Sequence, residues 1–155
     1  IWPFCEGKIV LPVASSLFLP QRPYLPLGSL RQAICYPEPA ESVATSDLCH
    51  VLELCQLDKF IDRLDVVDDW SRILSLGEQQ LLAFARILLV KPQWAFLDEA
   101  SSAMDEPLEK YMYGLLQQCL PNMSVISVGH RSTLLMHHEK QLKLSGDGQW
   151  ELVLV

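Results

Sequence analysis

Residues 74–105 read LSLGEQQLLAFARILLVKPQWAFLDEASSAMD. Ser75 stands where a helix N-cap would stand, and Glu78 follows three positions later, so the two form a capping box ahead of an apolar run. We expect a helix to begin there and to end before Pro92. Its first turn leaves unpaired backbone N–H groups at the positive end of the helix dipole, and Gly77 allows another group to come close. The helix start is therefore a candidate anion site.

The end of the same stretch predicts a strand over 94–98, followed by two acids, Asp98 and Glu99. A continuous apolar run bounded by proline and acid is typical of a strand that is buried on both faces of a parallel sheet. Strands and helices alternate around it, with a nearly all-helical block at 29–72, so we expect an α/β fold with an inserted helical part. The other predicted elements are strands at 8–13 and 16–21, helices at 30–36, 46–56, 58–63 and 106–119, a buried strand at 123–128, a short helix at 132–138, and strands at 140–144 and 149–154 around a turn at 146–148.

Composition excludes several classes of function. The 155 residues carry a net charge of −7 and no cluster of Lys and Arg, so duplex nucleic acid is a poor partner. The five cysteines are widely spaced and form no C-x-x-C pair, which favours reduced thiols over a zinc site or a disulfide framework. No run approaches the roughly 18 to 20 apolar residues that a membrane span needs.

Three predicted strands are followed by polar side chains with useful chemistry. Gln21, the Asp98–Glu99 pair and His130 each come at the carboxyl end of a strand, where ligands bind in open parallel sheets. If they converge, they supply a metal-binding acid, a second acid able to act as a base, an amide and an imidazole. Taken singly, an acidic pair can simply begin a turn, and a lone histidine is more often structural.

Four ordered segments carry a family resemblance: FLPQRPYLPLGSLRQ (18–32), LSLGEQQ (74–80), WAFLDEASSAMD (94–105) and SVGHR (127–131). They resemble the Q-loop, signature, Walker B with D-loop, and switch-histidine motifs of the ATP-binding cassette (ABC) ATPases. The signature wording, with DWSRI before it, is most similar to the branch whose ATPase follows a fused membrane domain, such as peroxisomal fatty-acyl transporters and SbmA/BacA-like bacterial transporters. The resemblance implies a P-loop NTPase fold, with core portions at 1–28 and 92–155 and a helical signature subdomain at 29–91.

The resemblance also implies roles for single residues. Asp98 matches the acid that holds Mg²⁺, usually through water, and Glu99 matches the general base that polarises the attacking water. His130 matches the residue that contacts the γ-phosphate of ATP. Gln21 matches the residue that senses Mg²⁺ and the lytic water, and Asp105 matches the D-loop acid at the dimer interface.

The helix start matches the signature, which binds ATP held by the opposite subunit of a head-to-tail dimer. The residues implied to contact that nucleotide are Ser75, Gly77, Glu78 and Gln79. The implied function is an ATP hydrolase motor that drives a solute across a membrane, from the cytoplasmic face of, for example, a bacterial inner membrane. The implied partners are a transmembrane domain fused upstream and a second nucleotide-binding domain, with no nucleic acid.

The sequence also departs from the family pattern. No G-x-x-x-x-G-K-[ST] phosphate-binding loop (Walker A) is present, and Gly7-Lys8 is followed by Ile9 rather than by a hydroxyl residue. We therefore expect an N-terminally truncated fragment that is inactive by itself. Leu76 replaces a signature glycine, and Leu81 stands where an arginine is usual. The alternatives are a soluble ABC ATPase that acts on DNA or ribosomes, and a non-catalytic fragment.

Overall fold

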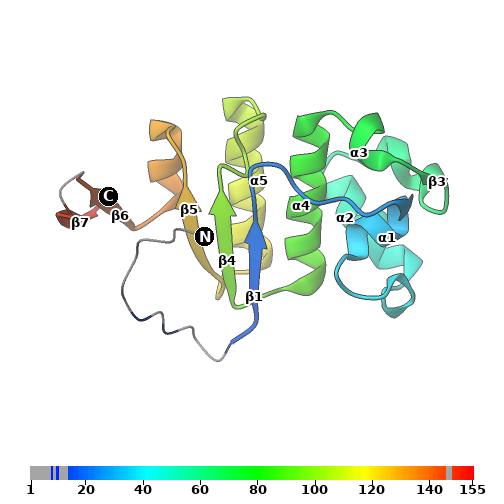
Figure 1. Cartoon of the computed structure of the whole chain (residues 1–155), viewed down its shortest axis with the longest axis horizontal. Coiled ribbons are helices and arrows are strands. Elements are labelled where there is room, and N and C mark those ends of the chain that lie inside the picture. Colours follow the sequence, from blue (N-terminus) through cyan, green and yellow to red (C-terminus); the bar gives the residue numbers. More distant parts are fainter. Residues whose placement is uncertain (1–7, 9, 11–13, 146–147) are drawn as a thin grey trace.

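A parallel sheet lies at the centre of the computed structural model, which describes residues 8, 10, 14–145 and 148–155 (Figure 1). Its three strands follow the order β1-β4-β5, with Leu17 opposite Ala95 and Ala95 opposite Val125. Because the strands are parallel neighbours, their carboxyl ends meet at one edge of the sheet. The strands are β1 (Ser16–Leu19), β4 (Trp94–Asp98) and β5 (Ser124–Val128). The strand predicted at 8–13 and the turn predicted at 146–148 fall largely outside the described residues.

Two long helices pack beside this sheet, and the smaller helices lie on the far side of α4 from it (Figure 1). The helix α4 (Leu76–Val90) begins after the N-cap Ser75 and ends at Lys91, whose φ of 49° is left-handed. The helix α5 (Glu106–Cys119) begins with Pro107 in its first turn, as predicted. The helices beyond α4 are α1 (Leu30–Cys35), α2 (Thr45–Leu54) and α3 (Trp70–Ile73).

Some predicted helical segments have a different local structure. The block at 29–72 also contains an antiparallel ladder, in which β2 (Gly28–Ser29) pairs with β3 (Val67–Asp68). The segments predicted as helices at 58–63 and 132–138 are the 3-10 helices η2 (Asp58–Arg63) and η3 (Ser132–His137), and η1 (Ala40–Ser42) is another. Such short pieces lack the length that favours a regular α-helix.

The core lies between the sheet and the helices, and includes the fully buried Trp70 and Phe84. In β4, Ala95 and Leu97 are 0% and 1% exposed, whereas the alternate residues are only half-buried. The expectation that the 94–98 strand is buried on both faces is therefore wrong.

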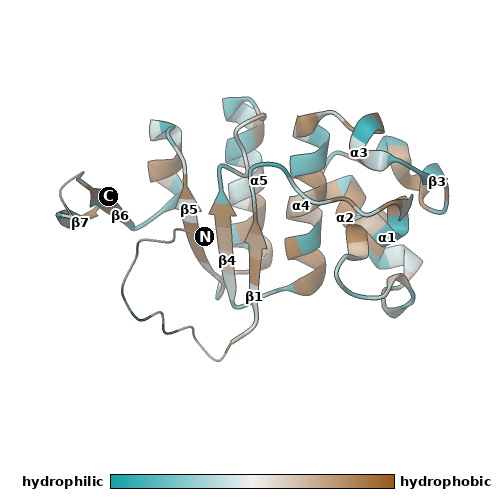
Figure 2. Ribbon diagram, in the orientation of Figure 1, coloured by the Kyte–Doolittle hydropathy of each residue, from teal (hydrophilic) through white to brown (hydrophobic). Residues whose placement is uncertain are grey.

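The prediction of a buried strand at 123–128 is also wrong, because Ile126 and Val128 of β5 are 45% and 58% exposed. One face of the sheet, with Ala95 and Leu97, is thus buried, whereas apolar side chains of the other face such as Phe18 and Ile126 remain accessible. Figure 2 shows apolar colour along the three strands, whereas α4 carries both apolar and polar segments.

The chain ends in a hairpin of β6 (Lys140–Leu144) and β7 (Trp150–Leu154), as predicted. In its register, Leu142 lies opposite Leu152 and Leu144 lies opposite Trp150, so apolar side chains alternate onto one face. These four side chains are between 55% and 77% exposed. The hairpin therefore presents an apolar face to solvent.

Candidate functional site

Three polar side chains predicted from the sequence come together at the carboxyl edge of the sheet. Gln21 follows β1, Glu99 follows β4 and His130 follows β5. The Gln21 amide Nε2 donates to Glu99 Oε2 at 2.6 Å, and His130 Nε2 lies 3.0 Å from Glu99 Oε1. Glu99 is thus the centre of the cluster, with one partner on each carboxylate oxygen. A carboxylate offers about four lone-pair positions, so it can accept further hydrogen bonds from water or substrate.

The backbone at Glu99 has an unusual conformation that turns the chain sharply after β4. Its φ is 48°, in the left-handed region that residues other than glycine seldom adopt. The Glu99 N–H donates to Val128 O at 2.8 Å, and Ser102 N–H donates to Glu99 O at 3.0 Å, so both sides of the turn are fixed. Strained conformations of this kind cost about 1–3 kcal/mol and cluster at functional sites.

Asp98 ends β4 opposite Val128 of β5, half-buried and next to the cluster. Its carboxylate and the Gln21 amide oxygen are hard oxygen donors, which suit Mg²⁺ bound mainly by substrate phosphates and water. No group of three His, Cys, Asp or Glu side chains within the described ranges could hold a metal ion.

Gln80, which no local signal in the sequence marks as a site residue, joins this cluster to its surroundings. It is fully buried on α4 and its Nε2 donates to Gln21 O at 2.9 Å, to Glu99 O at 3.3 Å and to Ser102 Oγ at 3.1 Å. Its Oε1 accepts from Ala103 N–H at 2.9 Å. One side chain thus holds the segments after β1 and β4 against α4.

The N-terminus of α4 forms a second polar centre, separate from the Glu99 cluster. Ser75 Oγ accepts from Glu78 N–H at 3.3 Å, and Ser75 N–H donates to Glu78 Oε2 at 2.7 Å, which confirms the predicted capping box. Lys59 Nζ lies 2.6 Å from Glu78 Oε1. A Cβ atom at Gly77 would lie 3.3 Å from Ala103 O, so this glycine lets the helix start approach the turn at 101–105 closely.

The remaining predicted site residues have local partners. The Gln79 amide is buried, and its Nε2 donates to Ser71 O and to Leu74 O, both at 2.9 Å. Asp105 is the N-cap of α5, and its Oδ1 accepts from Leu108 N–H at 2.9 Å. In this structure both side chains support the backbone, and neither is bonded to Gln21, Glu99 or His130.

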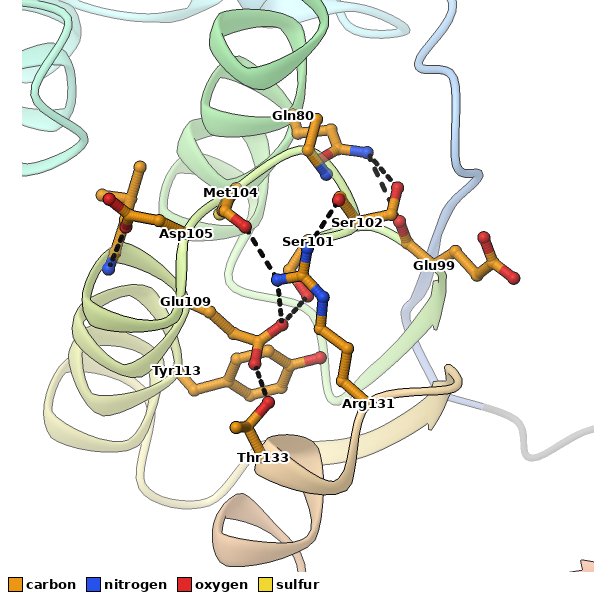
Figure 3. A network of polar contacts seen from close by, with 12 residues as sticks. Gln80, Glu99, Ser101, Ser102, Met104, Asp105, Glu109, Tyr113, Arg131 and Thr133 are labelled. Atoms are coloured by element: carbon orange, nitrogen blue, oxygen red, sulfur yellow. Dashed lines mark hydrogen bonds and ion pairs between the residues drawn. The ribbon is translucent and has the colours of Figure 1, made fainter.

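Glu109 and Arg131 form a further polar network beside the site, shown in Figure 3. The signal for Glu109 was present in the sequence, because it lies on the buried stripe of α5 with Met112, Tyr113 and Leu116. A lone carboxylate at helical spacing on an apolar stripe indicates a buried, paired charge. Its partners lie far along the chain, so the sequence alone does not name them.

None of the helices formed by the described residues has the length and hydrophobicity that crossing a membrane requires. The cysteines among these residues, at positions 35, 49, 55 and 119, are free thiols. Burial raises the pKa of the Cys55 thiol to about 12.

The chain is similar to curated ABC transporter proteins over nearly its whole length. It is 50% identical over 153 residues to an uncharacterized ABC transporter ATP-binding protein of Haemophilus influenzae, covering 99% of the chain and 26% of that protein. It is 38% identical to the human ATP-binding cassette sub-family D member 3, covering 97% of the chain and 24% of that protein. It is also 39% identical to the human lysosomal cobalamin transporter ABCD4, covering 90% and 24%. The chain spans about a quarter of the length of these relatives.

The fold agrees with this sequence relationship. A bacterial Atm1-family ABC exporter, solved with ATP bound, superimposes with a TM-score of 0.72 at 22% identity, covering 83% of the chain and 23% of that structure. No protein-family model matches the chain. By sequence over almost all of its residues, and by an α/β fold consistent with a P-loop ATPase, the chain belongs to the ATP-binding proteins of ABC transporters.

Proposed function

We propose that these residues are part of the ATP-hydrolysing motor of an ABC transporter and supply its general base and its nucleotide sensors. The observation that carries the proposal is the convergence of Gln21, Glu99 and His130 at the carboxyl edge of three neighbouring strands. Glu99 acts as the base that orients and polarises the attacking water, since it keeps acceptor positions beyond its two partners. His130 contacts the γ-phosphate, and Asp98 with Gln21 faces the Mg²⁺ that enters with ATP.

The start of α4 contributes to a second nucleotide, held by another copy of the motor. Exposed Ser75 and the close-packed Gly77 lie at the positive end of the α4 dipole, which favours a phosphate group there. Glu78 forms an ion pair with Lys59, and this pairing limits the repulsion between the Glu78 carboxylate and an incoming anion. In this arrangement ATP joins two motors head to tail, a transmembrane domain receives the motion, and the motor works at the cytoplasmic face of the membrane.

The function divides between these 155 residues and a phosphate-binding loop that they do not contain. The P-loop Lys and its backbone nest hold the β- and γ-phosphates in this class of enzyme. We therefore expect no ATP hydrolysis above background from residues 1–155 alone, and the assays of nucleotide binding and ATPase activity use the full-length protein that carries these residues.

The test compares wild type with Glu99→Gln in that full-length protein. Removing the base is expected to lower kcat at least about 100-fold while ATP binding is retained, because the substitution keeps the size of the side chain. In the Glu99→Gln variant, the ATP-bound dimer should then accumulate, as measured by light scattering. The double variant Glu99→Gln, Ser75→Arg should form no such dimer but should still bind ATP. Glu106→Gln, an exposed change on α5, is the matched control. Retention of ATPase activity by Glu99→Gln would show that the base lies elsewhere.

A further inference from the structure

The Arg131 side chain connects the loop after β5 to the turn after β4. It follows His130 directly and reaches across to the turn at 101–105, as Figure 3 shows. Its Nη1 donates to Met104 O at 2.7 Å and its Nη2 donates to Ser102 O at 2.8 Å. A guanidinium holds its donors in a fixed fork, so both contacts depend on one orientation of the side chain.

Glu109 anchors this guanidinium from the first turn of α5. Its carboxylate is 1% exposed and lies 3.6 Å from Arg131 Nη1. Ser101 Oγ donates to Glu109 Oε2 at 2.7 Å, and Thr133 Oγ1 donates to Glu109 Oε1 at 2.6 Å. The buried charge is therefore compensated by an ion pair, by two hydroxyl groups and by its place near the helix N-terminus. We call Arg131, Glu109 and the two carbonyls bound by Arg131 the clamp.

The turn at 101–105 is also held from its opposite side. Gln80 bonds Ala103 N–H and Ser102 Oγ, and Ala103 O packs against the position of Gly77 at the start of α4. The turn thus lies between the His130 loop and the helix that carries Ser75. A small cavity of about 110 Å³ lies beside it and is lined by Glu99 and His130 of the Glu99 cluster and by Glu109 and Arg131 of the clamp.

We propose that Arg131 and Glu109 are positioning residues that couple His130 to the start of α4 through this turn. The proposal rests on the proposed function, in which His130 contacts the γ-phosphate. Any displacement of His130 moves the adjacent Arg131, and the clamp transfers that displacement to the carbonyls of Ser102 and Met104. The turn then shifts Ala103 O against Gly77. The clamp thereby adjusts the α4 anion site to the state of the nucleotide bound beside His130.

The first test measures amide hydrogen exchange in the full-length protein without nucleotide. Arg131→Lys keeps the charge but lacks the fork, and Glu109→Gln keeps the shape but lacks the charge. Each is expected to speed exchange at 102–105 about tenfold, with strands 94–98 and 124–128 unchanged. The matched controls are the exposed changes Arg72→Lys and Glu106→Gln. Unchanged exchange at 102–105 in both variants overturns the clamp. If Glu109→Gln fails to fold, Thr133→Val is used in place of that variant, because it removes one hydrogen-bond donor to the Glu109 carboxylate.

The second test adds a non-hydrolysable ATP analogue with Mg²⁺. In wild type, exchange should slow at 102–105 and at 75–78, whereas Arg131→Lys should keep the nucleotide bound and lose the response at 75–78. In steady-state assays, kcat should fall about tenfold, whereas KM for ATP should stay within about twofold of the wild-type value. The kcat is calculated per molecule of folded, nucleotide-binding protein, so a general loss of folded protein does not lower it. A retained response at 75–78 in Arg131→Lys overturns the coupling. A wild type that neither binds nor hydrolyses ATP refutes the proposed function instead, and the nucleotide-free comparison still tests the clamp.

Discussion

The Glu78 carboxylate stabilises the start of α4, because it completes the capping box with Ser75 and forms an ion pair with Lys59. Burial acts to raise the pKa of its carboxyl, but hydrogen bonds from Lys59 and Ser75 outweigh burial and lower the pKa below its usual value. A lowered folded-state pKa means that ionised Glu78 stabilises the fold above its unfolded pKa of about 4.3. That contribution is lost as the pH falls through the folded-state pKa.

We therefore expect Glu78→Gln to reduce the free energy of unfolding at pH 7 by about 0.5–1 kcal/mol and to have no effect near pH 3. The estimate is small because Lys59 is 62% exposed and solvent screens the pair, and because glutamine can still accept the capping hydrogen bond. Urea unfolding followed by tryptophan fluorescence at a series of pH values measures the difference. Glu38→Gln, at an exposed acid, is the control, and a difference that persists undiminished at pH 3 contradicts the account.

The hydrogen-bond partners of a residue can be predicted from the sequence where they lie close along the chain. Ser75 and Glu78 are three positions apart, so their pairing could be predicted. Gln80 and Arg131 could not be assigned, because their partners lie in segments that only the tertiary fold brings together. The conformation of Glu99 is likewise imposed by its surroundings rather than by its own preference.

Helix α4 is tied to its neighbours by one buried cation. Arg86 is 5% exposed, its Nη2 donates to Ala33 O at 2.6 Å and to Tyr24 O at 2.8 Å, and it lies over the Tyr36 ring. Burial lowers the pKa of the Arg86 guanidinium to about 10. Within the described residues its hydrogen-bond partners are backbone carbonyls rather than a carboxylate, so it serves to join α1 and the 22–27 loop to α4.

Arg86→Met is expected to lower the free energy of unfolding by about 2–4 kcal/mol, because two carbonyls lose charged donors in a buried setting. Denaturant unfolding measures this loss, and hydrogen exchange should show faster opening of α1 than of β4. Arg72→Met, at a side chain that is 86% exposed, should change the free energy by less than about 0.5 kcal/mol. If Arg86→Met and Arg72→Met lower the free energy of unfolding equally, Arg86 does not join α1 and the 22–27 loop to α4.

The elements themselves were largely predictable, since α5, β4, β6 and β7 follow clear periodicity and end signals. The burial of β5 could not be predicted, because an apolar run of its length predicts a buried strand whether one or both faces of the strand are covered. Two-residue strands such as β2 and β3 carry no periodic signal at all. The division of the chain at 29–91 stays a prediction.

Among the residues that the structure describes, apolar side chains gather on two uncovered surfaces. One is the open face of the sheet, where Phe18 and Val128 are 60% and 58% exposed, and the other is the hairpin face with Leu144 and Trp150, 77% and 67% exposed. Exposed apolar patches and strand edges promote association. The chain by itself should therefore bind a hydrophobic dye and self-associate.

Replacing Leu144 and Trp150 together with lysine should reduce both dye fluorescence and the apparent mass in sedimentation, because charges then occupy the hairpin face. Gln141→Lys, on the opposite face of the hairpin, is the control and should have the smaller effect. A monomeric wild-type chain that unfolds cooperatively and binds no dye would disprove this account of the surfaces.

The register of the sheet also has a consequence for how the chain reaches its fold. Strand β1 pairs with β4 directly, although residues at their ends such as Gln21 and Glu99 are 78 positions apart, and the whole helical block lies between them. Closing so long a loop carries an entropy cost, but doubling its length adds only about 0.6 kcal/mol. We expect collapse of the helices onto α4 to bring the two strand ends together before they pair, so that parallel pairing of β1 with β4 is a late step of folding. We also expect the helical block to tolerate changes in length at little thermodynamic cost, as long as its two ends remain side by side.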